Sequence, residues 1–179
     1  MKNVIKLIIS IVVCQLAGVI GAVFTTPAIS GWYASLEKPS FNPPNWVFGP
    51  VWTALYFLMG ISLYLVWKKN WVSDSPINPE EQKSWNPISD RLWTGSWRAK
   101  NVIIIFFFQL VLNILWSVIF FGLKAPYFAF FEMLALWFSI LYTIINFHRV
   151  SKKAGLLLLP YILWVSFALV LNFSIWWLN

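Results

Sequence analysis

Charged side chains are scarce in this sequence. Asp, Glu, Lys and Arg make up 11% of its 179 residues, whereas a typical soluble domain has about 25%. So few charges cannot cover a water-facing surface, and a membrane environment explains their scarcity directly. The single cysteine, Cys14, has no second cysteine with which to form an intrachain disulfide.

Histidine is equally rare, and other signs of enzyme chemistry are missing. His148 is the one histidine, and it lies at the end of an apolar run without a metal-ligand partner. The sequence contains no nucleophile–base pair, no phosphate-binding glycine loop and no Cys/His cluster. We therefore predict no metal site and no obligatory cofactor.

The net charge of +7 raises the question of a nucleic-acid partner. The basic residues, however, lie between the apolar runs and do not form one basic face. We therefore predict that the protein binds no nucleic acid.

Long apolar runs are what the sequence has in abundance, since 60% of its residues are hydrophobic. Five runs have about the ~20 residues that a helix needs to cross ~30 Å of hydrocarbon: Val4–Phe24, Trp46–Trp67, Val102–Leu123, Tyr127–Phe147 and Leu156–Leu178. Backbone polar groups in lipid must pair within each span, and these runs do not alternate as barrel strands do. We predict an all-α fold, an integral membrane bundle of five transmembrane helices.

Residues 1–179 are then a single membrane domain. Its helices are expected at approximately 4–26, 46–69, 102–123, 127–148 and 154–178. Eleven of the 13 Lys and Arg residues fall on the side of the N-terminus, and only Lys38 and Lys124 fall on the other side. This bias predicts a cytoplasmic N-terminus if the host is a bacterial inner membrane.

Two connections are long enough to have structure of their own. Residues 27–45 contain four prolines and several aromatic side chains, which fits either an interfacial linker or a semi-rigid lid over a cavity mouth. Residues 70–101 are polar and rich in tryptophan. Surface anchoring and partner binding are both open for that loop, and the sequence does not decide its role.

Polar residues inside the spans are expensive in hydrocarbon and therefore mark packing or function. The 3.6-residue period of a helix places members of three sets on common faces: Gln109, Asn113 and Trp116; Tyr161, Trp164, Ala168 and Leu171; and Trp52 with Tyr56. These faces suit either a pocket for a flat, mostly apolar ligand or hydrogen bonds that only join helices.

Two further features of the spans leave alternatives open. Glu132 is the one acid within a span, and it either reaches the interface or pairs with Lys124. Gly18 and Ala22, four residues apart, form a small-residue face that supports either internal packing or a homodimer.

Three segments together resemble a known family. They are Trp32–Tyr56 (WYASLEKPSFNPPNWVFGPVWTALY), Gln109–Gly122 (QLVLNILWSVIFFG) and Leu159–Asn172 (LPYILWVSFALVLN). This pattern resembles the TspO/MBR family of tryptophan-rich sensory and translocator proteins, and the likeness covers nearly the whole chain except residues 70–100.

The resemblance implies a membrane receptor or sensor that binds porphyrins, such as protoporphyrin IX or haem. Transport of the bound porphyrin across the membrane is an open alternative. It also implies a homodimer and, in animal members, cholesterol binding. Cholesterol is doubtful here, because Phe173 stands at the tyrosine position of the cholesterol motif and no Lys or Arg follows it.

The implied ligand-binding residues combine the family's positions with the polar faces described above. They are Trp32, Pro39, Phe48, Trp52, Tyr56, Gln109, Asn113, Trp116, Trp164, Phe167, Ala168 and Leu171. An alternative function is light- and oxygen-dependent porphyrin degradation. In that case Trp52 and Trp164 are the expected catalytic pair.

Overall fold

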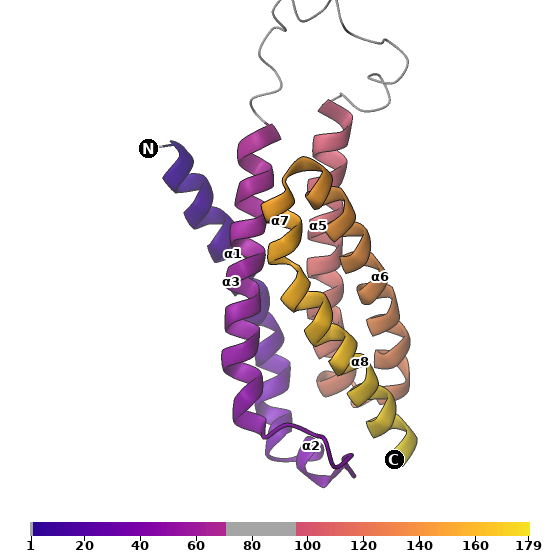
Figure 1. Ribbon diagram of the computed structural model, residues 1–179. Coiled ribbons are helices and arrows are strands. Elements are labelled where there is room, and N and C mark those ends of the chain that lie inside the picture. The colour runs from indigo at the N-terminus through magenta and orange to yellow at the C-terminus, as the bar shows by residue number, and fades with distance from the viewer. Residues whose placement is uncertain (1, 71–95) are drawn as a thin grey trace, which may run out of the picture.

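The computed structural model describes residues 2–70 and 96–179, with side chains for residues 3–69 and 101–179. These residues form helices and no strand (Figure 1). The elements are α1 (Lys2–Ile29), α2 (Trp32–Ser35), α3 (Asn45–Asn70), α5 (Ser96–Ser117), the π-helical turn η2 (Val118–Gly122), α6 (Pro126–Val150), α7 (Lys152–Leu157) and α8 (Leu159–Leu178).

Five of the described segments are long and apolar enough to cross a membrane, which confirms the predicted all-α membrane fold. They are Asn3–Ile29, Asn45–Lys69, Asn101–Gly122, Pro126–Val150 and Lys152–Leu178. The two chain ends lie at opposite ends of the bundle, as an odd number of spans requires (Figure 1).

Some helix ends differ from the sequence expectation. Helix α1 continues through Pro27 to Ile29, although proline has no N–H to donate to the Val23 carbonyl. The third span ends in η2, where the Leu123 amide donates to the Val118 carbonyl at 2.8 Å. The fifth span is two helices that meet at Leu158.

The bundle is tightly closed at the end where α3 meets α7. The Ser62 hydroxyl donates to the Ala154 carbonyl at 2.8 Å. A Cβ added to Gly60 would lie 2.7 Å from the Ile11 Cα, and one added to Gly155 would lie 2.8 Å from the His148 Cα. Glycines at these crossings let the backbones approach closely.

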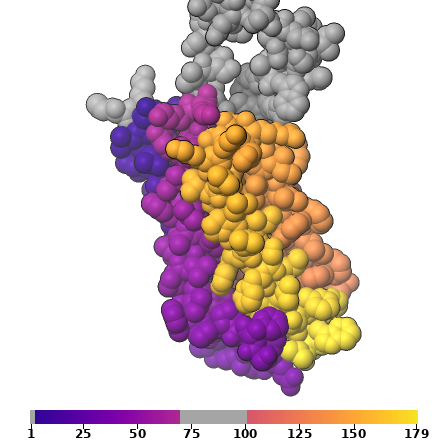
Figure 2. Space-filling view, in the orientation of Figure 1, coloured from indigo at the N-terminus to yellow at the C-terminus, as the bar shows by residue number. Residues whose placement is uncertain are grey.

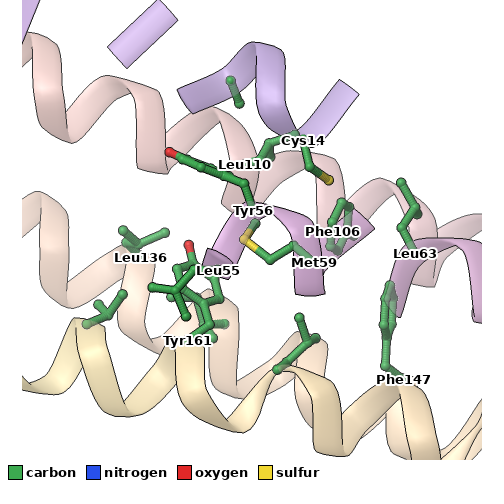
Figure 3. Close-up of a cluster of buried hydrophobic side chains, with 14 of the residues drawn as sticks. Cys14, Leu55, Tyr56, Met59, Leu63, Phe106, Leu110, Leu136, Phe147 and Tyr161 are labelled. Carbon is green, nitrogen blue, oxygen red and sulfur yellow. The ribbon is translucent and has the colours of Figure 1, made fainter. Parts of the chain in front are cut away.

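Apolar side chains fill the interior of this closed half (Figure 3). Cys14, Met59 and Phe106 are fully buried there, and the rings of Phe106 and Phe147 stack with centroids 5.4 Å apart. Side chains therefore fill the interior of this cluster.

Beyond Leu158 the arrangement opens. Helix α7 packs against α3, but α8 continues along α6 while α3 continues along α1. The break at Leu158 therefore separates the paths of α3 and α8, and α2 lies across the end of the bundle where they diverge (Figure 1).

Candidate functional site

A cavity of about 460 Å³ occupies the open half of the bundle. Its walls come from α1, α3, α5, η2 and α8, and Tyr33 of α2 closes one end. Ligand sites for small molecules commonly measure about 300–1,000 Å³ and are mostly apolar with a few polar groups. The space therefore has the size of such a site.

Most of the residues expected to bind a ligand line this cavity. From α3 these are Phe48, Trp52 and Tyr56, from α5 Asn113 and Trp116, and from α8 Trp164, Ala168 and Leu171. Helices α3, α5 and α8 therefore direct these aromatic and amide side chains toward one common space.

Four expected site residues lie outside the lining. Trp32 packs edge-on against Phe120 at 5.6 Å, and Phe167 packs behind Trp164 at 5.5 Å. The Pro39 carbonyl accepts from the Asn42 amide in the connection before α3. Gln109 is buried one turn below the cavity. Trp32 and Phe167 thus support wall residues from behind.

A buried hydrogen-bonded chain forms the floor of the cavity and links three helices. The Tyr56 hydroxyl donates to Asn113 Oδ1. Asn113 Nδ2 donates to the Tyr161 hydroxyl at 3.0 Å, and that hydroxyl donates to Gln109 Oε1 at 2.9 Å. Figure 3 shows Tyr56 and Tyr161 within the buried cluster. Asn113 therefore both joins helices and faces the cavity, while Gln109 only joins helices.

A second amide fixes the wall nearer the lid. Trp116 Nε1 donates to Asn172 Oδ1 at 3.0 Å, and Asn172 Nδ2 donates to the Pro126 carbonyl at 2.9 Å. With Oδ1 and one N–H of Nδ2 engaged, Asn172 fixes the Trp116 indole, which lines the cavity.

Aromatic rings bridge α3 and α8 across the cavity. Phe48 and Trp164 meet edge-on at 6.0 Å, and Trp52 and Tyr161 meet at 6.3 Å. On the face shown in Figure 2, side chains of α8 (yellow) lie directly beside those of α3 (purple). Trp164 Nε1 is buried and has no hydrogen-bond partner among the described residues.

Helix α1 contributes a wall that sequence reasoning did not assign to the site. Gly18, Gly21, Ala22 and neighbouring residues line the cavity. A Cβ added to Gly18 would lie 2.6 Å from the Tyr56 ring. The small-residue spacing was the available signal, and in the structure this glycine serves internal packing.

The segment before α3 is held over the cavity by several contacts. The Tyr33 hydroxyl donates to Asn42 Oδ1 at 2.9 Å, and Lys38 Nζ lies 4.9 Å from the Tyr33 ring centroid. The Asn179 side chain accepts from the Glu37 amide and donates to the Glu37 carbonyl, both at 3.0 Å. Burial raises the pKa of Tyr33, and the Asn42 hydrogen bond partly offsets this.

Glu132 does not reach a partner in the structure. Both of its carboxyl oxygens are buried and have no hydrogen-bond donor among the described residues. Glu132 does not line the cavity. No group of three His, Cys, Asp or Glu side chains that could hold a metal occurs in the described part of the chain.

Comparisons with known proteins agree with the sequence pattern. Residues 10–178 match the TspO/MBR family. The chain is 41% identical over 177 residues to the tryptophan-rich protein TspO of Archaeoglobus fulgidus, with 99% of each chain covered. It is 37% identical over 145 residues to the translocator protein of Homo sapiens, covering 81% of this chain and 73% of that protein. It is also 32% identical over 162 residues to the tryptophan-rich sensory protein of Cereibacter sphaeroides, covering 89% and 85%.

Proposed function

This chain belongs to the TspO/MBR family of integral multi-pass membrane proteins, and from that premise we propose that its cavity binds a porphyrin or a similar flat hydrophobic molecule. A receptor or sensor role fits this family. Protoporphyrin IX and haem are the proposed ligands.

The observation that carries the proposal is the pair of aromatic walls facing one cavity. Trp52 of α3 and Trp164 of α8 both line it, and Phe48 lies between the two helices. Offset or edge-on contacts with aromatic rings contribute about 0.5–1.5 kcal/mol per pair beyond the burial of area. A flat aromatic ligand between these walls makes such contacts on both of its faces.

Two polar groups are placed to orient such a ligand. Trp164 Nε1 is a buried donor without a partner among the described residues. Asn113 lies at the floor, where its amide is already held by Tyr56 and Tyr161. A ligand that brings an acceptor to Trp164 satisfies that N–H and gains a hydrogen bond of about 1 kcal/mol.

A titration with protoporphyrin IX tests the proposal. Purified protein should show saturable quenching of tryptophan fluorescence. The double substitution Trp52→Phe and Trp164→Phe should weaken binding by about 5- to 30-fold, which corresponds to roughly 1–2 kcal/mol of lost ring contact.

The matched control removes the same number of tryptophans outside the cavity. Trp176 and Trp177 lie near the end of α8 and do not line the cavity. The substitutions Trp176→Phe and Trp177→Phe should leave the affinity unchanged. Equal affinities for the two double variants would reject the proposed site.

Photochemical degradation of the porphyrin is the second candidate function, because Trp52 and Trp164 line the same space. Illumination of the complex in air should then bleach the Soret band faster than it bleaches free protoporphyrin in detergent. Equal bleaching rates would leave binding, with or without transport, as the function. Flux of protoporphyrin into liposomes, compared with protein-free vesicles, tests transport.

A further inference from the structure

Exposure of the cavity wall is confined to one side. All of its exposed lining residues belong to α1 and α3, with Val19 at 61% and Trp46 at 74%. The full set is Val19, Ala22, Thr26, Asn45, Trp46, Gly49 and Thr53. The lining residues of α5, η2, α8 and α2 are buried or half-buried. The cavity therefore opens between α1 and α3.

The opening results from how these two helices cross. They touch closely where Ile11 meets Gly60 and where Gly18 meets Tyr56. Toward the other end of the pair, the residues that face the gap include the small Ala22 and Gly49. Apart from its chain neighbours and its own helix backbone, a Cβ added to Gly49 meets no atom within 4 Å. No described side chain of α1 lies within that distance.

The opening lies at the depth of the lipid chains. Gly49 and Thr53 follow Asn45, the first residue of α3, by four and eight residues. At ~1.5 Å per residue they lie ~6 and ~12 Å along a 25-residue span of ~37 Å. In a centred hydrocarbon core ~30 Å thick, Gly49 therefore lies near the edge and Thr53 lies inside. Val19 of α1 faces the same gap and is apolar. The mouth therefore faces acyl chains.

Polar groups beside the mouth are engaged within the protein. Gln15 Nε2 donates to the Thr53 carbonyl at 3.0 Å, and the Thr53 hydroxyl donates to the Gly49 carbonyl at 2.9 Å. The Thr53 hydroxyl and one N–H of the Gln15 amide are therefore satisfied without water, as polar groups in hydrocarbon must be.

The end of the cavity under α2 is closed by contrast. Tyr33 is buried there, and Trp32 packs on Phe120. The Asn179 amide joins the chain at Glu37 to the end of α8 with two hydrogen bonds. A ligand entering beneath α2 must displace this cover, whereas the gap between α1 and α3 is open along its length from Asn45 to Thr53.

We propose that the ligand enters and leaves the cavity sideways from the bilayer, through the gap between α1 and α3. This inference rests on the proposed function and specifies the class of ligand. The site takes molecules that partition into lipid before they bind, and their polar edge lies toward Asn45 and Thr26 at the lid end of the gap.

A substitution that fills the gap tests the route. In Gly49→Leu the new Cβ starts in open space outside its own helix and chain neighbours. Gly49 precedes Pro50, and a side chain before proline resists helical geometry, so circular dichroism must show equal helicity in this variant and the unsubstituted protein. The matched control, Ala54→Leu, adds similar bulk to an exposed position of α3 that does not line the cavity. Asn179→Ala loosens the cover instead.

Stopped-flow fluorescence in proteoliposomes measures exchange of protoporphyrin IX with each variant. Gly49→Leu should slow association and dissociation together, each by about tenfold, within the range by which rates vary at one binding site. Damage to a ligand contact would instead speed dissociation. Ala54→Leu and Asn179→Ala should match the unsubstituted protein. Unchanged rates in Gly49→Leu, or much faster exchange in Asn179→Ala, would overturn the proposal.

A second measurement does not depend on porphyrin binding. A small hydrophobic diazirine dissolved in the bilayer should label Trp52 on photolysis, and Gly49→Leu should reduce that labelling several-fold, as measured by mass spectrometry. Absence of label on Trp52 in the unsubstituted protein would refute the lateral opening. Labelling of Trp52 without any porphyrin binding would support the opening and reject the proposed ligand.

Discussion

Replacement of Asn113 by leucine tests the double role that the structure gives this amide. Asn113 is buried, accepts from the Tyr56 hydroxyl and donates to the Tyr161 hydroxyl. Interhelical hydrogen bonds in membranes contribute roughly 0.6–1.7 kcal/mol each. The Tyr56 hydroxyl also loses the acceptor it uses, at a cost of about 1–3 kcal/mol. The free energy of unfolding should fall by roughly 2–4 kcal/mol.

Gln109→Leu is the matched comparison one turn away. Gln109 accepts one hydrogen bond from Tyr161, and its Nε2 is buried with no partner among the described residues. The substitution leaves the Tyr161 hydroxyl without its acceptor, but it also removes the unsatisfied Nε2 group. These two effects are of similar size and opposite sign, so the net cost should stay below about 1 kcal/mol. Unfolding in mixed micelles, followed by circular dichroism, measures both variants.

Ligand binding separates the two residues further. Asn113 lines the cavity and Gln109 does not. Protoporphyrin affinity should therefore fall in Asn113→Leu and remain unchanged in Gln109→Leu. Equal losses of stability, or equal losses of affinity, would refute the distinction between a residue that faces the ligand and one that only joins helices.

Three other perturbations have defined outcomes. Gly60→Ala should lower the free energy of unfolding by about 1–3 kcal/mol, because its Cβ would meet the Ile11 backbone. Gly49→Ala should cost less than Gly60→Ala, because only the adjacent Pro50 resists a Cβ there; micelle unfolding tests the pair. Glu132→Gln should leave the melting temperature unchanged or raise it, since the carboxyl has no hydrogen-bond partner among the described residues; a fall of more than ~3 °C, about 1 kcal/mol, would contradict this. Burial raises the pKa of Tyr33 above its usual value of 10.0. The protonated hydroxyl therefore stabilises the folded state below about pH 10, and this free energy is lost as pH rises through the folded pKa. The ultraviolet titration of the unsubstituted protein minus that of Tyr33→Phe should show this late ionisation.

The membrane fold follows from the sequence alone because its cause is local. A run such as Trp46–Trp67 cannot be solvated by water, and its backbone must pair within itself, whatever surrounds it. The helical period then places Gln109, Asn113 and Trp116 on one face. The structure confirms this, because Gln109 and Asn113 are buried and Trp116 packs against the core.

The ends of the elements were less predictable. The break at Leu158 has a local signal, because Pro160 lies in the first turn of α8 and has no N–H to continue α7. The π-helical end of the third span has no such signal, since η2 lies in a run that reads as ordinary apolar helix. Ala154 and Gly155 are pressed against α3 and α6 at the break.

Which polar residues face a cavity and which only join helices was decided by tertiary structure. Asn113 and Gln109 both carry amides and lie one turn apart. Both are buried, yet only Asn113 lines the cavity. The exposed gap beside Gly49 also has no signature in its own helix. A cavity is what remains after separate helices have packed, so its position depends on crossings such as that of Ile11 with Gly60, and no single span contains both partners.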